Sequence, residues 1–280
     1  MARSAVPPRA RDGNGWHISF GVHTGRKADA PNGKPACGVD FGVAASAFVS
    51  TETTPRLMPP TLTAHEKKRL KALEQRKARE ITYAKKHNGG KYSRRLRTTI
   101  AQIARLTTRR ANRRHDFTHK LTTDLAKNHG LIGIEDLRVK NMSKSAKGTA
   151  ETPGKNVRAK AGLNQSVLDN MPGERRRQLE YKARMYGSVL VAVPPFHTSQ
   201  TCAKCGQVDL GSRKGCGRLF ACTRCGHEDD ADHNASVEIE ARARRTGGSD
   251  INSTRSIPRM RVPATGRRRM RETPKPAHAS

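Results

Sequence analysis

The chain of 280 residues has room for one sizeable hydrophobic core and a small appended module. Its 55 Lys and Arg against 24 Asp and Glu leave a formal charge of +31, which would destabilise a compact monomer by self-repulsion unless a polyanion neutralised it. We therefore expect a nucleic-acid partner, with a merely soluble basic surface or a ribosome-associated protein as the alternative.

The composition also argues against membrane and disulfide-rich classes. No apolar run approaches the roughly 20 residues needed to cross a bilayer, and residues 1–15 lack the apolar segment of a signal peptide. Four of the six cysteines form two CxxC pairs, which without a secretion signal indicates metal ligands and not disulfides. We expect a reducing location, the cytoplasm or nucleoid, and no membrane partner.

The first 50 residues predict short strands. Residues 1–35 hold one candidate strand, at 16–22, between stretches rich in Pro, Gly and Arg. Two apolar strands are expected at 36–41 and 45–50. Asp40 lies inside the first of them, as a charge in an otherwise small and apolar run.

Two long helices are expected next, over 64–87 and 91–129, with a break at 87–90. Apolar residues of the second helix recur mostly at three- and four-residue steps, which predicts packing along one face. The other faces carry many basic residues without balancing acids, which favours a surface that contacts nucleic acid. The arginines expected to make these contacts are Arg94, Arg95, Arg105, Arg109 and Arg113.

The remaining chain predicts alternating short elements. In order, these are a strand at 131–134 that ends at Glu135 and Asp136, a mobile basic loop at 141–165, a helix at about 173–186, a strand at 188–193, a cysteine-rich module at 197–228, a helix that begins near Asp232, and a disordered basic tail from Thr246.

Three acids occur where folding alone explains them poorly. Asp40 lies in one apolar strand, Glu135 at the end of another, and Asp232 at the start of the last helix. A buried, unpaired carboxylate costs several kcal/mol, so such a group is normally paired or holds a metal. If the two strands are neighbours, the three side chains can surround one point, and oxygen ligands suit Mg²⁺ or Mn²⁺. Two such ions would support hydrolysis of a phosphodiester bond.

Other acids compete for these roles, and each of the three could instead be a turn or cap residue. Asp136 should point away if Glu135 faces the site, because side chains alternate along a strand. Asp230 stays open as the third ligand or as a helper. We favour Asp232 because Asn234 follows closely, and its amide could orient a carboxylate or contact phosphate.

The two CxxC pairs predict a zinc ribbon. Cys202 and Cys205 are separated from Cys222 and Cys225 by 16 residues, which is the spacing of a four-cysteine zinc site. A glycine follows each pair, where the chain must turn. Four thiolates complete the coordination of Zn²⁺, so we expect this ion to be structural and not catalytic.

Several segments resemble one known family. GVDFGV at 38–43, IEDLRVKNM at 134–142 and DADHNAS at 230–236 resemble, in this order, the three RuvC motifs of TnpB, the nuclease family encoded by bacterial insertion sequences. RRQLEYKARMYG at 176–187 and PPFHTSQTCAKCG at 194–206 are similar to the stretches that lead into its zinc ribbon. The similarity runs from about residue 14 to 240.

The resemblance implies an α/β fold: an RNase H-like (RuvC) mixed sheet with a long helical hairpin insertion and an inserted four-cysteine zinc ribbon. It implies a catalytic triad of Asp40, Glu135 and Asp232 with Mg²⁺ or Mn²⁺, and a ribbon in which Cys202, Cys205, Cys222 and Cys225 hold structural Zn²⁺. The activity implied is cleavage of DNA guided by a transposon-derived RNA.

The resemblance also implies a division of the chain. Residues 1–35 would be the remnant of an N-terminal wedge domain, 36–196 the nuclease core with the helical insertion 64–129, 197–228 the ribbon, 229–245 the final nuclease segment and 246–280 the tail. Family members usually carry well over a hundred residues before the first motif, so we expect an N-terminally truncated relative.

Two main functions follow. The first is a Mg²⁺-dependent DNA endonuclease of a mobile element, with DNA and, if targeting is retained, guide RNA as partners. The second is a truncated, cleavage-deficient protein that binds DNA or RNA. A nuclease of the Holliday-junction or RNase H type, without a guide, is the third alternative.

Overall fold

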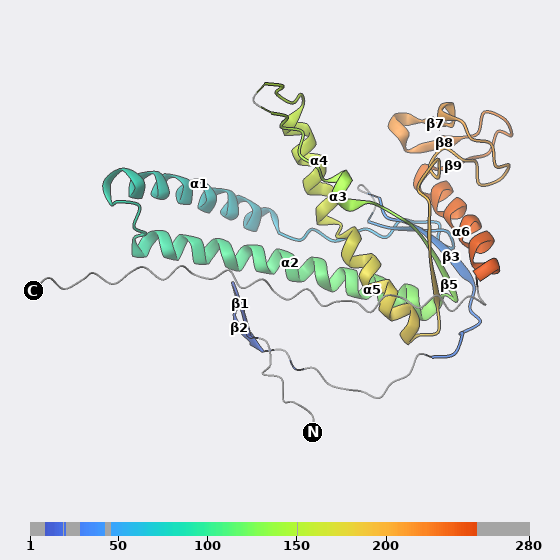
Figure 1. Ribbon diagram of the computed structural model, residues 1–280, viewed down its shortest axis with the longest axis horizontal. Helices are drawn as coiled ribbons and strands as arrows, with labels where there is room; N and C mark the ends of the chain where they lie inside the picture. Colours follow the sequence, from blue (N-terminus) through green and yellow to red (C-terminus); the bar gives the residue numbers. More distant parts are fainter. Residues whose placement is uncertain (1–8, 19, 21–28, 43–45, 150, 251–280) are drawn as a thin grey trace, which may run out of the picture.

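The computed structural model describes residues 9–18, 20, 29–42, 46–149 and 151–250. Figure 1 shows a small sheet between helices, a long helical hairpin that extends away from it, and a three-stranded module beside the sheet. The strands are β1 (Arg9–Asp12), β2 (Gly15–Ile18), β3 (Ala36–Asp40), β4 (Phe48–Val49), β5 (Leu131–Glu135), β6 (Val189–Val193), β7 (Arg213–Lys214), β8 (Leu219–Ala221) and β9 (Glu228–Asp230). The helices are α1 (Ala64–His87), α2 (Arg94–Asn128), α3 (Val139–Met142), α4 (Val157–Asp169), α5 (Pro172–Met185) and α6 (Ala231–Asp250), with 3₁₀ turns at η1 (Leu210–Ser212) and η2 (Gly215–Gly217).

The central sheet is mixed, with the strand order β4-β3-β5-β6. β3, β5 and β6 are parallel, and β4 is antiparallel to β3. The register pairs Val39 with Ile134, so Asp40 and Glu135 end neighbouring strands at the same edge of the sheet. Asp40 was expected within its strand, but it is the last residue of β3.

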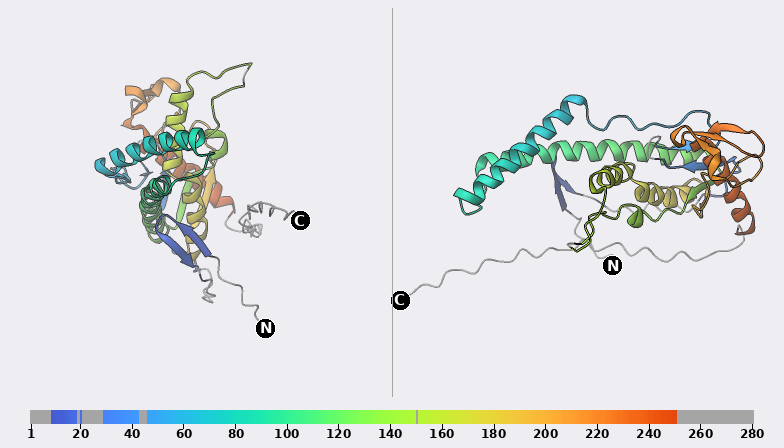
Figure 2. Two further views of the ribbon diagram at one scale, coloured as in Figure 1. Left: turned by 90° about the vertical axis from the view of Figure 1, so that its left-hand side faces the viewer. Right: turned by 90° about the horizontal axis from the view of Figure 1, so that it is seen from above.

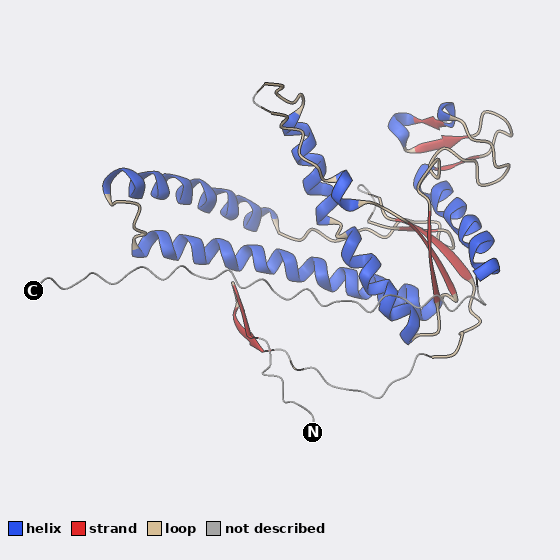
Figure 3. Cartoon of the chain, viewed as in Figure 1, coloured by secondary structure: helices blue, strands red, loops and turns tan. Residues whose placement is uncertain are grey.

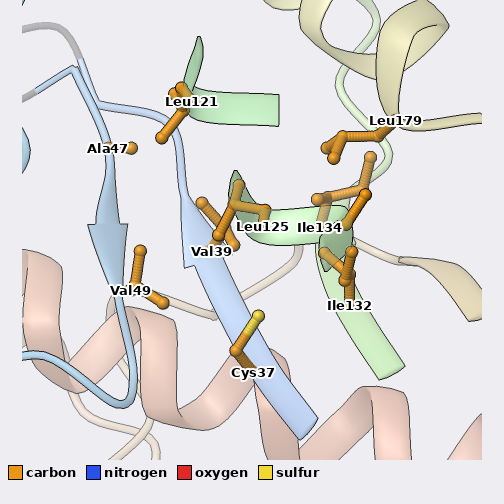
Figure 4. Close-up of a cluster of buried hydrophobic side chains, with 10 residues drawn as sticks. Cys37, Val39, Ala47, Val49, Leu121, Leu125, Ile132, Ile134 and Leu179 are labelled. Atoms are coloured by element: carbon orange, nitrogen blue, oxygen red, sulfur yellow. The ribbon is translucent and has the colours of Figure 1, made fainter. Parts of the chain in front are cut away.

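Helices cover both faces of this sheet, as the cartoon in Figure 3 shows. Because side chains alternate along a strand, odd and even positions of β3 and β5 face different layers. On one face, α2 and α5 pack against the strands in the core cluster of Figure 4, which includes Cys37, Val39, Val49, Leu121, Leu125, Ile132, Ile134 and Leu179. The apolar face predicted for α2 therefore packs against the sheet through Leu121 and Leu125.

The other face packs against α6 at very short range. A Cβ atom on Gly38 would lie 2.0 Å from the carbonyl oxygen of Ser236 and 2.4 Å from the amide nitrogen of Glu240. A Cβ atom on Gly133 would lie 2.7 Å from the Cβ of Ala243. Glycine is required at both strand positions because any side chain would push the helix away from the sheet.

The helical hairpin forms where the sequence predicts it. α1 has the expected bounds, and α2 begins at Arg94, slightly later than expected. Thr63 and Glu66 form a capping box at the start of α1, and Ser93 caps α2 through the amide of Leu96. Figure 2 shows that α2 runs back beside α1 toward the sheet, with the short β1–β2 hairpin against α2.

The loop expected over 141–165 is wrong in part. α3 overlaps its start, and residues 157–165 belong to α4. Long-range contacts hold this segment: the Asn164 amide donates to the carbonyls of Ser143 and Lys144, both at 3.1 Å. At the end of α4, Asp169 forms ion pairs with Arg110 and Arg114. Composition alone cannot reveal partners so distant in sequence.

The expectations for the two ends also need correction. The strand predicted at 16–22 ends at Ile18, pairs with the unpredicted β1, and has positions 19, 21 and 22 outside the described residues. α6 continues through Asp250, so 246–250 are helical and not part of a disordered tail. The rest of that predicted tail, 251–280, lies outside the described residues. Within the described ranges, no helix has an apolar stretch long enough to cross a membrane.

We predict that Gly38→Ala lowers the free energy of unfolding by about 1–3 kcal/mol, because its Cβ would overlap the backbone of α6. Urea unfolding followed by circular dichroism measures the change. Gly162→Ala is the matched control: Gly162 lies in α4, and an added Cβ there would meet no neighbouring atom within 4 Å, so alanine should stabilise by about 0.5–1 kcal/mol. Equal stability of the two variants would contradict the packing described.

Candidate functional site

The three predicted acids lie at one edge of the sheet. Asp40 and Glu135 are the last residues of the neighbouring parallel strands β3 and β5. Asp232 is in the first turn of α6, the helix packed on those strands. The carboxyl edge of parallel strands is where α/β proteins commonly bind ligands.

The charges of both Glu135 and Asp232 act on the buried Asp40. Burial raises the pKa of the Asp40 carboxyl to about 8, and the negative charges of Glu135 and Asp232 contribute to this rise. Burial also raises the pKa of Glu135 and of Asp232. A bound cation would reverse these effects by favouring the charged form of each acid.

Glu135 is oriented by a residue that the sequence did not single out. The buried Thr198 donates its hydroxyl to Oε1 of Glu135. This hydrogen bond and the charge of Arg242 both lower the pKa of Glu135 against the larger effect of burial. Thr198 lies just before the first cysteine pair, so the segment entering the cysteine module also positions a candidate ligand.

The competing acids have other partners. Asp136 forms an ion pair with Arg176. Asp230 accepts hydrogen bonds from the backbone amides of Asp232 and His233, at 2.8 and 3.3 Å, and thereby caps α6. Asp230 and not Asp232 is therefore the helix cap, although the charge of Asp230 still acts on both Asp40 and Asp232.

The donor set suits a hard divalent cation, since all three side chains offer carboxylate oxygens. The three acids do not form a single tight cage. Among the described residues, the four cysteines are the group whose ligand atoms all lie within 4.8 Å of one another, and the acids are spaced more widely. A two-ion site tolerates this wider spacing because each ion needs only some of the acids.

The charge of one arginine in the cysteine module acts on two of the acids. The charge of Arg213, on β7, lowers the pKa of both Asp40 and Asp232. Its guanidinium donates to the carbonyl of Gly217 at 2.7 Å, which fixes it at the edge of the module. Sequence reasoning missed Arg213, because only the folding of the module back toward the sheet brings this arginine near the acids.

The four predicted cysteines come together and could hold a metal ion. The Sγ atoms of Cys202 and Cys225 are 3.7 Å apart, and those of Cys205 and Cys222 are 3.6 Å apart. The strands β7, β8 and β9 form an antiparallel sheet beside them. Cys216, an exposed free thiol, is outside the group.

Each cysteine pair lies in the same kind of turn. The amide of Gly206 donates to the carbonyl of Cys202, and that of Gly226 to the carbonyl of Cys222, at 2.8 and 3.1 Å. Both glycines have positive φ, which a side chain would disfavour. The backbone amide of Cys225 lowers the pKa of the Cys222 thiol to about 6, whereas burial raises that of Cys202. The lowered value favours the thiolate, which is the form that binds metals.

Asn234 connects the two candidate sites. Its side chain accepts from the amide of Ala203 at 3.0 Å and donates to the carbonyl of Thr201 at 2.8 Å, and it is fully buried. These bonds fasten the first cysteine turn to α6. The expectation that this amide orients a carboxylate or contacts phosphate is corrected, because both of its polar atoms hold the module.

The predicted nucleic-acid arginines of α2 are exposed but differ in their partners. Arg109 and Arg113 both form ion pairs with Glu66 at 2.7 Å, which ties α2 to the start of α1. Arg95 pairs with Glu80 at 3.1 Å. Arg94 and Arg105 form no ion pair with an acid in the described part of the chain.

Comparisons with known proteins agree with the motifs. Residues 19–146 match the family described as "Probable transposase", and residues 173–239 match "Cas12f1-like, TNB domain". A protein of Escherichia coli (strain K12) named "Putative RNA-guided DNA endonuclease InsQ" is 39% identical over 226 residues, which are 81% of this chain and 53% of the relative. A "Putative RNA-guided DNA endonuclease" of Streptomyces pristinaespiralis is 30% identical over 254 residues, 89% of this chain and 55% of the relative.

Among solved structures, a Cas12f1–sgRNA–target DNA complex is similar at 18% identity with a TM-score of 0.42, covering 83% of this chain and 55% of that one. The chain spans about half the length of the curated relatives that it matches. The two family matches cover the predicted motifs in their order along the chain, and the relatives cover most of it. The chain belongs to the TnpB family of insertion-sequence proteins.

Proposed function

We propose that this protein is a transposon-associated, metal-dependent DNA endonuclease with an RNase H-like (RuvC) core. The observation that carries the proposal is the arrival of Asp40, Glu135 and Asp232 from three distant segments at one edge of the sheet, where the charges of Glu135 and Asp232 both act on the buried Asp40. The β3–β4 hairpin followed by parallel β5 and β6 supports the RNase H-like arrangement. The relatives named as RNA-guided DNA endonucleases support DNA as the substrate.

The three acids would hold Mg²⁺ or Mn²⁺ through their carboxylate oxygens. Two bound ions would activate a water molecule and stabilise the departing oxygen of the scissile phosphate. The hydroxyl of Thr198 keeps Glu135 in one orientation, and burial of the acids strengthens their attraction for a cation. Asp230 supports the third acid by fixing the first turn of α6.

Arg213 would meet the phosphate that enters this site. It is a permanent cation, and its charge acts on two of the three acids from the ribbon side. A guanidinium can donate two parallel hydrogen bonds to a phosphate. The ribbon would therefore contribute to the substrate site, besides holding its own zinc ion.

Guide RNA and DNA are the proposed partners, with the basic face of α1 and α2 as one contact surface. Arg94 and Arg105 are exposed there and available to phosphates, whereas the exposed Arg95 would contact them while also paired with Glu80. Arg109 and Arg113 would contact nucleic acid while also holding Glu66. The alternative is a protein that binds nucleic acid without cutting it.

We predict that the purified chain cleaves single-stranded DNA with Mg²⁺, and that Asp40→Ala, Glu135→Ala and Asp232→Asn each reduce the rate by at least about 100-fold. Cleavage of a labelled oligonucleotide on a denaturing gel measures this. Asp136→Ala is the matched control, because this acid serves an ion pair with Arg176. Activity in the Asp40 or Glu135 variants equal to wild type would exclude the nuclease proposal.

The same assay tests Arg213. Arg213→Ala should reduce cleavage, whereas Arg218→Ala, a variant of another arginine in the same ribbon, should not. If the wild type binds DNA tightly but does not cleave it, and no variant changes this, the chain is the alternative: a protein that binds nucleic acid without cutting it.

The cysteine group is proposed to hold one structural Zn²⁺ per chain. Cys202→Ser combined with Cys222→Ser should abolish the zinc content and lower the thermal stability, because structural zinc contributes directly to folding. Elemental analysis by mass spectrometry of dialysed protein measures it. Cys216→Ser, which removes a cysteine outside the group, should retain one zinc. A wild type without zinc would contradict the proposal.

A further inference from the structure

The turn between α1 and α2 forms a surface remote from the candidate nuclease centre. α2 has 35 residues, or about 50 Å at 1.5 Å per residue, and it contributes Leu121 and Leu125 to the core at its other end. Figures 1 and 2 show the turn at the end of the hairpin farthest from the sheet. The tip is therefore separate from the three acids and from the four cysteines.

An aromatic pair lies exposed at this tip. Tyr83 is 66% exposed, and its ring packs against that of His87 in a tilted arrangement, with centroids 4.6 Å apart and an interplanar angle of 33°. The two residues are four positions apart on α1 and thus share one face of the helix. At such exposure the outer face of the tyrosine ring is open to solvent, so it can stack on another flat group.

Two hollows flank Tyr83, and both are lined by Tyr83 and Arg79. One, of about 520 Å³, lies between the helices and also contacts Asn88 and Lys91. The other, of about 450 Å³, lies along α1 and also contacts Lys86 and His87. Both hollows are open to solvent and their volumes are within the range of sites that hold small molecules.

The charge around these hollows is positive. The first is lined by the cations Arg76, Arg79, Lys91 and Arg95 against the single acid Glu80, which pairs with Arg76 and Arg95. No acid lines the second hollow. Within the described residues, Arg79, Lys86 and Lys91 form no ion pair. These three cations are therefore available to an anionic ligand.

We propose that Tyr83, supported by His87, stacks on an unpaired nucleobase while Arg79, Lys86 and Lys91 contact the neighbouring phosphates. Bases stack on tyrosine and histidine rings without regard to sequence, and lysine and arginine on either side hold the backbone. The ligand is single-stranded nucleic acid, because the base faces of a duplex are hidden except at its ends. The proposal rests on the proposed function for its nucleic-acid partner and adds a base-stacking site to the basic surface of the hairpin, since Arg95 of that surface also lines the first hollow.

The test is fluorescence of a single-stranded oligonucleotide containing 2-aminopurine, in an RNA and a DNA version, titrated with the full chain without added Mg²⁺. Stacking on Tyr83 should quench the probe. Tyr83→Ala should lose the quenching and bind roughly 5- to 150-fold more weakly, whereas Tyr83→Phe keeps the ring and should bind as wild type does. If Tyr83→Ala loses quenching and affinity with the RNA probe alone, RNA is the ligand of this site. If it loses them with the DNA probe alone, DNA is the ligand.

Tyr92→Ala is the matched control, because Tyr92 is a 46% exposed tyrosine of the same hairpin that lines neither hollow. Arg79→Gln should lower the slope of log affinity against log salt by about 0.7, the value for one phosphate contact on a single strand. The far-UV circular dichroism spectra of the Tyr83 and Arg79 variants should match that of wild type, since neither Tyr83 nor Arg79 is buried.

The proposal is overturned if Tyr83→Ala binds as tightly as wild type, or if Tyr92→Ala weakens binding equally. It is also overturned if a blunt duplex depends on Tyr83 as strongly as the single strand does. Because no Mg²⁺ is added, these results are independent of cleavage: a failed site at Tyr83 leaves the nuclease proposal intact, and an inactive nuclease centre leaves this site intact.

Discussion

The close approach of α6 to the sheet is the constraint on which the rest of the structure depends. Gly38 and Gly133 leave room for the backbone of the helix to contact the strands directly. This packing brings Asp232, at the start of α6, to Asp40 and Glu135 at the ends of those strands. A helix held farther away by larger strand residues would separate the third acid from the other two.

The same helix also places the cysteine module. Asn234, two residues after Asp232, holds the backbone of Thr201 and Ala203, next to the first cysteine. Farther along α6, Arg242 donates to the carbonyls of Pro194 and Phe196 at 3.2 and 2.6 Å. The segment between these contacts carries Thr198, which binds Glu135. The two candidate metal sites therefore share one scaffold, although they differ in ligand chemistry.

The distribution of the acids explains how so basic a chain folds. Glu66 and Asp169 each pair with two arginines of α2, so a few acids fix the helices at selected points. At the sheet edge, burial and the charges of Glu135 and Asp232 instead raise the pKa of Asp40, so these acids meet there at an electrostatic cost. Groups arranged against their own repulsion are typical of functional sites.

Local patterns predicted the elements well, and long-range contacts account for the errors. The periodicity of apolar residues and the caps Thr63 and Ser93 are local, so both long helices were predictable. The CxxC spacing likewise predicted the cysteine group. In contrast, α4 depends on partners such as Ser143 and Arg110, and the proximity of Arg213 to the acids depends on the fold of the whole module. Asn234 was misassigned because its partners lie some 30 residues earlier in the chain.

The central claim is that Asp40, Glu135 and Asp232 form one metal centre, and anomalous diffraction from crystals containing Mn²⁺ tests it most directly. We predict strong peaks at about 2.1 Å from carboxylate oxygens of all three acids, with none at Asp136. Ordered Mn²⁺ bound elsewhere in the crystal, with these three acids free of metal, would contradict it.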